Sequence, residues 1–358
     1  MATYLISGVS RGLGFEFLRQ ASNNPANTVV GLVRNKTATE KKVSEELPDR
    51  KNIRLVRGDL DDYVSLKTAI DETADITGGA LDYVIANAAY MSTWSAYDPL
   101  GVLGKQPEEL EQDLLFSFKS NVIGNIHLFN LSLPLIFRGR VKKVIAISSG
   151  FADADLTAKF NIHDSAPYSV SKAALNMAVA KFSAEYSTQG ILFMTVSPGM
   201  VDTGLHKDAT PEQQQKIGVL VEKFQAYAPH FTGPTTAEVA VGLMLSVAEK
   251  ASIEAGDGGS SVSQFGNKEW LKAGVHVGQV TIGKDGDNVL NGVTVILPRH
   301  PDDIYIPCYA GMYTLNGNGK ASGSYQIADW GYTSAVRPSP HSPLCPQLLD
   351  FPGKFPLM

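Results

Sequence analysis

Short apolar runs alternate with longer amphipathic segments over the first 200 residues of the chain. The apolar runs predict strands over residues 3–8, 28–33, 53–56, 81–86, 143–148 and 191–197. The segments between them predict helices over residues 13–20, 110–134 and 168–186. Because the strands are almost continuously apolar, they should form a parallel sheet with both faces covered by helices. The pattern therefore predicts a doubly wound α/β fold.

The pattern changes near residue 270, where Gly and Asn become frequent and helical periodicity disappears. Residues 275–282 and 293–297 are typical of short strands, and six prolines fall among residues 334–358. We expect one α/β domain over residues 1–271, an irregular or β-rich appendage over 272–333, and a disordered tail over 334–358.

The composition of the chain limits the classes of function that it can have. The 358 residues are 44% hydrophobic and carry a net charge of -5, which is typical of a soluble globular protein and gives no basic surface for nucleic acid. No apolar run approaches the roughly 20 residues that span a bilayer, so we expect a cytoplasmic protein without membrane contact. The two cysteines, Cys308 and Cys345, are expected to be free thiols, and no metal site is expected.

A glycine-rich turn follows the first predicted strand and opens a helix. In nucleotide-binding folds such a turn lets the helix N-terminal amides face a pyrophosphate. Taken alone it is a weak signal, because many phosphate sites share it. We expect the turn to hold a dinucleotide through Gly8, Ser10, Arg11, Gly12, Leu13 and Gly14.

The second strand ends at Val33-Arg34, where an acidic residue would bind the ribose of NAD. Arg34 and Arg11 can instead pair with the 2'-phosphate of NADP, for which a guanidinium is well matched. The alternative is that both arginines only face solvent. The third and fourth strands end at Asp59-Leu60 and Asn87, on the ligand-binding edge of the sheet, where an aspartate can accept a hydrogen bond from adenine.

Tyr168 and Lys172 are four residues apart at the start of a helix, so both side chains project from one face. A neighbouring ammonium stabilises phenolate and should lower the tyrosine pKa from about 10 toward neutral pH. The same spacing also occurs in ordinary surface pairs.

The order of these motifs resembles the short-chain dehydrogenase/reductase family over residues 2–270, which implies a Rossmann-type fold. The resemblance implies that Tyr168 is the general acid for a carbonyl and that Lys172 holds the nicotinamide ribose. It implies that Ser149 polarises the carbonyl and that Asn121 holds a water in the proton relay. The segment expected to contact the nicotinamide comprises Pro198, Gly199, Val201 and Thr203.

Ser149 precedes Tyr168 by 19 residues, rather than the family's usual 13 or so. Residues 151–164 therefore carry an insertion, which should shape substrate specificity. The spacing leaves a choice between Ser148 and Ser149, and the strand register favours Ser149. His163 in the insertion is either catalytic or, as we favour, solvated. The polar helical stretch 210–227 is either a mobile lid or a surface helix.

Residues 273–332 are similar to the opening of the P1 aminopeptidases, of the L-aminopeptidase/D-esterase type. In that family the nucleophile lies far beyond this stretch, so we expect no second activity. Our hypothesis for this juxtaposition is an accidental fusion or a faulty gene model.

The sequence as a whole predicts an NADP-dependent oxidoreductase that interconverts a ketone or aldehyde and an alcohol. Within the family it is similar to small carbonyl reductases and fungal ketoreductases. The alternatives are a nucleotide sensor without chemistry and a bifunctional reductase and peptidase. The helices over 114–128 and 168–186 are expected to make a homodimer or homotetramer, although their small residues also suit core packing.

Overall fold

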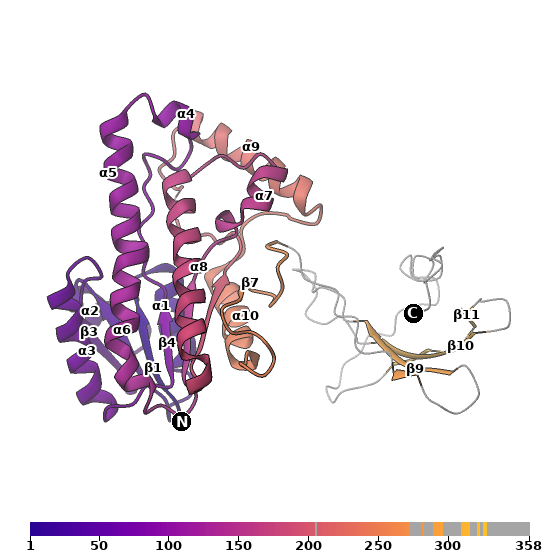
Figure 1. Ribbon diagram of the computed structural model, residues 1–358, viewed down its shortest axis with the longest axis horizontal. Helices are drawn as coiled ribbons and strands as arrows, with labels where there is room; N and C mark the ends of the chain where they lie inside the picture. Colours follow the sequence, from indigo (N-terminus) through magenta and orange to yellow (C-terminus); the bar gives the residue numbers. More distant parts are fainter. Residues whose placement is uncertain are drawn as a thin grey trace. The chain divides into compact units, whose positions relative to one another are not determined.

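The computed structural model describes residues 1–204 and 206–271 in full and, beyond them, only five short strands. The chain divides into two compact units, Met1–Gly274 and Val275–Met358 (Figure 1). The tail expected over 334–358 and both cysteines lie outside the described residues. In the second unit the described strands form an antiparallel sheet: β8 (Thr281–Ile282), β9 (Val289–Val295), β10 (Tyr309–Leu315), β11 (Ala321–Ser322) and β12 (Tyr325–Ile327).

The first unit contains a seven-stranded sheet in the order β3-β2-β1-β4-β5-β6-β7. Every pair of neighbouring strands is parallel. The order reverses between β1 and β4, which creates the crevice where doubly wound folds bind ligands. The strands are β1 (Thr3–Ser7), β2 (Thr28–Val33), β3 (Ile53–Arg57), β4 (Tyr83–Ala86), β5 (Lys143–Ile147), β6 (Leu192–Ser197) and β7 (Ser261–Ser263).

Helices cover both faces of this sheet, and alternate strand residues enter the two cores. Tyr4 and Ile6 of β1 pack beneath α1 (Gly12–Ala21), α2 (Lys36–Glu46) and α10 (Ala237–Lys250). Leu5, between them in sequence, packs on the opposite face with α3 (Tyr63–Thr77), α6 (Gly124–Ile136) and α8 (Ala166–Tyr186). The predicted doubly wound, Rossmann-type fold is confirmed.

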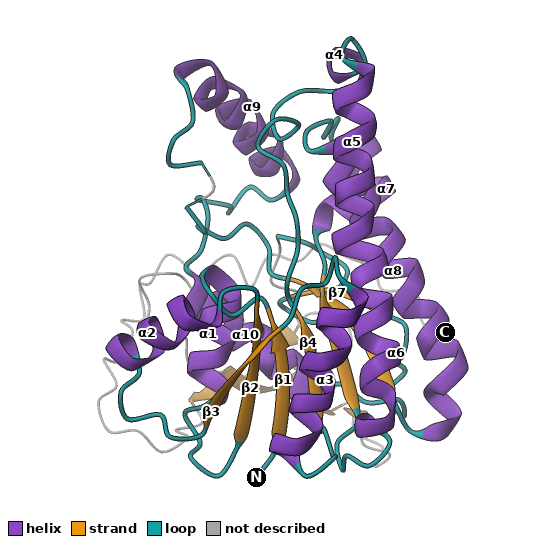
Figure 2. Cartoon of the chain, turned by 90° about the vertical axis from the view of Figure 1, so that its left-hand side faces the viewer, coloured by secondary structure: helices purple, strands orange, loops and turns teal. Residues whose placement is uncertain are grey.

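Four helices extend the unit beyond the carboxyl ends of the strands. The chain begins below the sheet in Figure 2, so the parallel strands run upward. Above them lie α7 (Ala154–Lys159), α9 (Pro211–Tyr227), α4 (Leu100–Leu103) and part of α5 (Pro107–Phe118). A capping box between Thr210 and Gln213 fixes the start of α9. No helix in the described part of the chain is long and apolar enough to cross a membrane.

The helix predicted over residues 110–134 is not continuous. A π-helical turn, Lys119–Ile123, separates α5 from α6. A π-turn inserts one residue into a helix, and such turns are frequent at functional sites. This turn carries Asn121.

Candidate active site

The glycine-rich turn is closely packed against the neighbouring strand. Gly8 has a φ of +75°, and a Cβ atom there would lie 2.9 Å from the Cα of Ala88. A Cβ atom on Gly14 would lie 2.1 Å from the carbonyl oxygen of Gly8. Only glycine satisfies both positions, because any side chain would push the turn apart. The turn thus keeps the N-terminus of α1 close to the end of β1, which fits a pyrophosphate cradle.

Asn87 fixes the opposite side of this crevice. Its Nδ2 donates to the carbonyl oxygen of Ser7 at 3.0 Å, and its backbone N–H donates to the Ser7 hydroxyl at 3.1 Å. These bonds hold the end of β4 against the end of β1. Nearby, Asp59 is partly buried and accepts a hydrogen bond from the backbone of Asp61 at 3.1 Å, whereas Leu60 is buried.

Cationic side chains surround the outer end of the crevice. Arg11 and Arg34 are both exposed, and within residues 1–204 and 206–271 neither guanidinium makes a hydrogen bond or ion pair. A third cation, which sequence reasoning missed, is Lys42 of α2: its Nζ lies 3.4 Å from the carbonyl oxygen of Ser10. No motif marked Lys42, because its position follows only from the packing of α2 beside the glycine turn.

Ser149 and Tyr168 meet at the carboxyl end of β5. Tyr168 lies in the first turn of α8, and its hydroxyl is hydrogen-bonded to that of Ser149. Ser149 Oγ also accepts from the backbone N–H of Phe151 at 3.2 Å. In contrast, the Ser148 hydroxyl is buried and bonded to Oδ1 of Asn176 at 2.6 Å. Of the two serines, Ser149 is therefore the one that faces Tyr168.

Lys172 lies one helical turn further along the same face of α8. Its side chain is only 2% exposed, and Nζ donates to the carbonyl oxygen of Ile147 at 2.7 Å. The ammonium lies 5.6 Å from the centre of the Tyr168 ring. Burial lowers the pKa of Lys172 to about 8, because the surroundings solvate the charged form poorly.

The expectation that Lys172 lowers the tyrosine pKa is wrong for the protein without cofactor. Burial raises the pKa of Tyr168 to about 12, and the hydrogen bond from Ser149 opposes this effect only in part. The physical reason is that desolvation penalises the phenolate more than its neighbours stabilise it. Tyr168 is therefore neutral, and holds its proton, at physiological pH.

Asn121 is fully buried in the π-helical turn, and its side-chain amide is bonded on both sides. Its Oδ1 accepts from the backbone N–H of Tyr90 at 2.7 Å, and its Nδ2 donates to the Tyr90 carbonyl at 2.8 Å and to the Ser171 hydroxyl at 2.9 Å. The amide thus joins the loop after β4 to α8. Asn121 is thereby bonded to the residue that precedes Lys172 in α8.

The segment after β6 returns to the glycine turn. Following Pro198, Gly199 has a φ of +73° and contacts Gln264 so closely that a Cβ atom would lie 2.5 Å from Nε2. Val201 pairs with Thr235 in a parallel β-bridge. The Cγ2 atom of Thr203 would lie 3.8 Å from a Cβ atom on Gly12. The segment expected to contact the nicotinamide therefore borders the turn expected to hold the phosphates.

Comparisons with known proteins agree with this arrangement. Residues 2–214 match the sequence profile of the short chain dehydrogenases. The chain belongs to the short-chain dehydrogenase/reductase family. It is 56% identical over 271 residues to the short chain dehydrogenase virK of Hypocrea virens, and 52% identical over 272 residues to the short-chain dehydrogenase/reductase iacC of Pestalotiopsis fici. Each match covers 76% of this chain and the whole of the relative.

A similar fold occurs in the NADPH-bound carbonyl reductase from chicken fatty liver. That structure has a TM-score of 0.58 and 22% identity, and the match covers 75% of this chain and 98% of the reductase. Separately, residues 273–338 match the profile of Peptidase family S58. The expected likeness of the C-terminal segment to an aminopeptidase is thus confirmed.

A hydrophobic cluster forms a small core of its own beside the turn that carries Ser149. It combines the insertion after Ser149, helix α9 and the end of the domain, and Phe151 stacks on Phe224 with ring centres 6.0 Å apart. We call these residues the apolar wall: Phe151, Leu156, Phe160, Ile162, Met200, Leu220, Val221, Phe224, Tyr227, Ala228, Phe231, Trp270 and Leu271.

Polar contacts hold α9 above the site. Lys216 pairs with Asp98 at 2.8 Å, and Lys223 donates to the carbonyl oxygen of Asn161 at 2.7 Å. His163 Nε2 lies 3.2 Å from Lys223 Nζ, and its side chain is exposed. His163 therefore contacts α9 rather than Tyr168. Helix α9 is itself packed on the domain, because its Phe224 belongs to the apolar wall.

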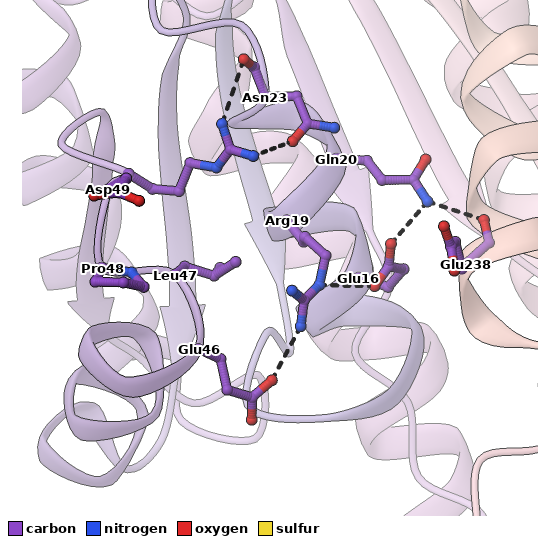
Figure 3. Close-up of a pocket in the computed structure, with 10 residues that line it drawn as sticks. Glu16, Arg19, Gln20, Asn23, Glu46, Leu47, Pro48, Asp49 and Glu238 are labelled. Atoms are coloured by element: carbon purple, nitrogen blue, oxygen red, sulfur yellow. Dashed lines mark hydrogen bonds and ion pairs between the residues drawn. The ribbon is translucent and has the colours of Figure 1, made fainter.

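A polar hollow of about 590 Å³ lies elsewhere, between α1, α10 and the loop after α2 (Figure 3). Its centre is Arg19, which pairs with Glu16 at 3.1 Å and with Glu46 at 3.0 Å. Arg50 closes one side through Asn23. None of the residues expected to act on cofactor or substrate lines this hollow.

Proposed function

We propose that this protein is an NADP-dependent reductase that converts a ketone or aldehyde to an alcohol, or catalyses the reverse reaction. The observation that carries the proposal is the hydroxyl pair Ser149–Tyr168 beside the buried Lys172, at the ligand-binding edge of the sheet. A bound nicotinamide cofactor would supply the hydride. The chain's own residues bind it, orient the carbonyl and provide the proton.

The cofactor roles follow the geometry of the crevice. The glycine turn would hold the pyrophosphate, and the adenosine would contact Asp59, Leu60 and Asn87. Lys172 would bind the ribose next to the nicotinamide, and residues 198–203 would contact the nicotinamide itself. The guanidinium groups of Arg11 and Arg34, which have no partner among the described residues, and Lys42 nearby favour the 2'-phosphate of NADP. The NADP complex of Pseudomonas aeruginosa RhlG, a structure of similar fold with a TM-score of 0.56, supports the same choice.

Proton transfer is assigned to Tyr168. Its raised pKa keeps the hydroxyl protonated at neutral pH, as a general acid for carbonyl reduction requires. Ser149 would donate a second hydrogen bond to the carbonyl oxygen, where negative charge develops. Asn121 would complete a proton relay through a water, and its bond to Ser171 keeps the relay next to α8. Within this class we propose a ketoreductase of secondary metabolism, and the identity to the short-chain dehydrogenases virK and iacC supports this choice.

The test is NADPH consumption against a panel of ketones, aldehydes and quinones, with NADH run alongside. Tyr168→Phe should abolish turnover, because it removes the acid while keeping the ring. NADPH binding, followed by fluorescence titration, should remain. Substantial activity in this variant would refute the mechanism. NADPH binding without turnover of any carbonyl would instead favour a nucleotide sensor.

We also propose a homodimer or homotetramer through α5 and α8. These helices pack on each other and expose large apolar side chains to solvent. The exposed fractions are 62% for Leu115, 54% for Phe116, 53% for Val170 and 61% for Met177. An apolar face of this kind is typical of a protein interface.

A further inference from the structure

Trp270 lies at the end of the first unit, yet it packs on the turn that carries Ser149. Its side chain is buried, with 7% exposed. A Cβ atom on Gly150, the residue after Ser149, would lie 3.0 Å from the Trp270 Cβ and 3.1 Å from its Cγ. The indole therefore limits where the backbone of the 3₁₀ turn Gly150–Ala152 can lie.

Hydrogen bonds fix the indole in this place. Its Nε1 donates to Oδ2 of Asp153 at 2.7 Å, and the other carboxylate oxygen of Asp153 caps α7 by accepting from the backbone of Leu156 at 2.9 Å. The backbone N–H of Trp270 donates to the Tyr227 hydroxyl in α9 at 3.0 Å. Trp270 thus connects the start of the insertion with the helix above the site.

The far side of the same turn is also restrained. The backbone N–H of Gly150 donates to the Ser197 hydroxyl at the end of β6, at 3.1 Å. The turn is therefore held between β6 on one side and Trp270 on the other. Ser149 caps this turn through its bond to the backbone of Phe151, so a shift of the turn moves the Ser149 hydroxyl away from Tyr168.

We propose that Trp270, anchored by Asp153, is a positioning residue that holds Ser149 against Tyr168 for carbonyl reduction. The proposal rests on the function proposed above. It places a determinant of the rate in the last residues of the reductase domain, far in sequence from the residues that carry the chemistry. It also assigns a structural role to the insertion, because Asp153 belongs to it.

The test compares Trp270→Phe with Phe231→Leu in the full-length chain. Trp270→Phe removes the indole N–H but keeps an aromatic ring, whereas Phe231→Leu trims the same apolar wall away from Gly150. We expect Trp270→Phe to lower kcat about tenfold, a fraction of the loss known for deleting an oxyanion donor, with the Kd for NADPH unchanged. Phe231→Leu should keep kcat within about twofold at a similar loss in Tm.

A double-mutant cycle decides whether the effect passes through Ser149. In a Ser149→Ala background, Trp270→Phe should cause little further loss of kcat. An equal tenfold loss in that background, or an equal loss in Phe231→Leu, would overturn the proposal and leave Trp270 a general packing residue.

Amide hydrogen exchange gives a measurement that does not depend on activity. The backbone N–H of Phe151 is protected by Ser149 Oγ, so Trp270→Phe should speed exchange in a peptide covering residues 149–156, and Phe231→Leu should not. Unchanged exchange in Trp270→Phe would overturn the proposal even in an active enzyme. If the wild-type chain reduces no carbonyl, the proposed function fails, while exchange still decides whether Trp270 positions Ser149.

Discussion

Replacing Lys172 by methionine tests how strongly the site desolvates its cation. The ammonium is 2% exposed and donates to the carbonyl oxygen of Ile147. Burial lowers its pKa from 10.5 to about 8 in the folded chain. Between these two values the unfolded chain binds one more proton than the folded chain, so the wild-type free energy of unfolding should rise with pH.

The size of the effect follows from the two pKa values. The slope reaches about 1.4 kcal/mol per pH unit in the middle of that window and is smaller near either pKa. The rise from pH 8 to 10.5 therefore totals about 3 kcal/mol relative to Lys172→Met, which does not titrate. This contribution is present above pH 10.5 and is lost as the pH falls through 8. Tyr168, with its pKa of about 12, stays neutral in most of this range and adds little.

The assay is urea unfolding of both proteins at pH 7, 8, 9 and 10, followed by the far-ultraviolet helix signal of the first unit. The difference between the two free energies should grow by about 1 kcal/mol per pH unit above pH 8. Parallel curves would refute the reasoning, because they would show that the Lys172 pKa is the same in the folded and unfolded chains.

Three further predictions concern the glycine turn, the cofactor preference and the proposed subunit interface. Gly14→Ala should weaken NADPH binding at least tenfold, because its Cβ atom would meet the Gly8 turn. The control is Gly218→Ala in α9, where a Cβ atom meets open space; it should raise the free energy of unfolding by about 0.5 to 1 kcal/mol. Equal NADPH affinity in the two variants would contradict the role of the glycine turn in holding the pyrophosphate. Arg34→Ser should raise the KM for NADPH about tenfold and leave that for NADH unchanged, in line with the loss of one charged hydrogen bond; equal losses for both cofactors would exclude a role at the 2'-phosphate. The pair Leu115→Asp and Met177→Asp should convert an oligomer to monomer in light scattering, and an unchanged mass would place the interface elsewhere.

The sequence predicts the central sheet well because its strands are buried on both faces. The strand predicted over residues 28–33 is Thr28–Val33 in the structure, and the others agree within two residues at each end. Parallel topology then brings the strand ends to one edge, which is why the glycine turn, Asn87 and Ser149 lie near one another. β7 was not predicted, because three residues are too few to show a periodic pattern.

The rest of the site depends on contacts between segments that are distant in sequence. No local pattern places Trp270 against Gly150, and none places Lys42 beside Ser10. The direction of the Tyr168 pKa shift could not be predicted either, because it depends on how completely the folded chain excludes water from the hydroxyl. Spacing along a helix shows which charges are neighbours, but it does not show how far they are desolvated.

The π-helical turn Lys119–Ile123 has a consequence for how this protein tolerates change. The wider turn accommodates one residue more than an α-helical turn, so deleting a single residue there would restore a regular helix and keep α5 and α6 close to their present register. The exposed apolar side chains of α5 would keep their direction, and α6 would stay fixed on the sheet. A one-residue deletion would thus remove the local geometry that places Asn121 beside Tyr90 and Ser171 without changing the outer surface of the protein.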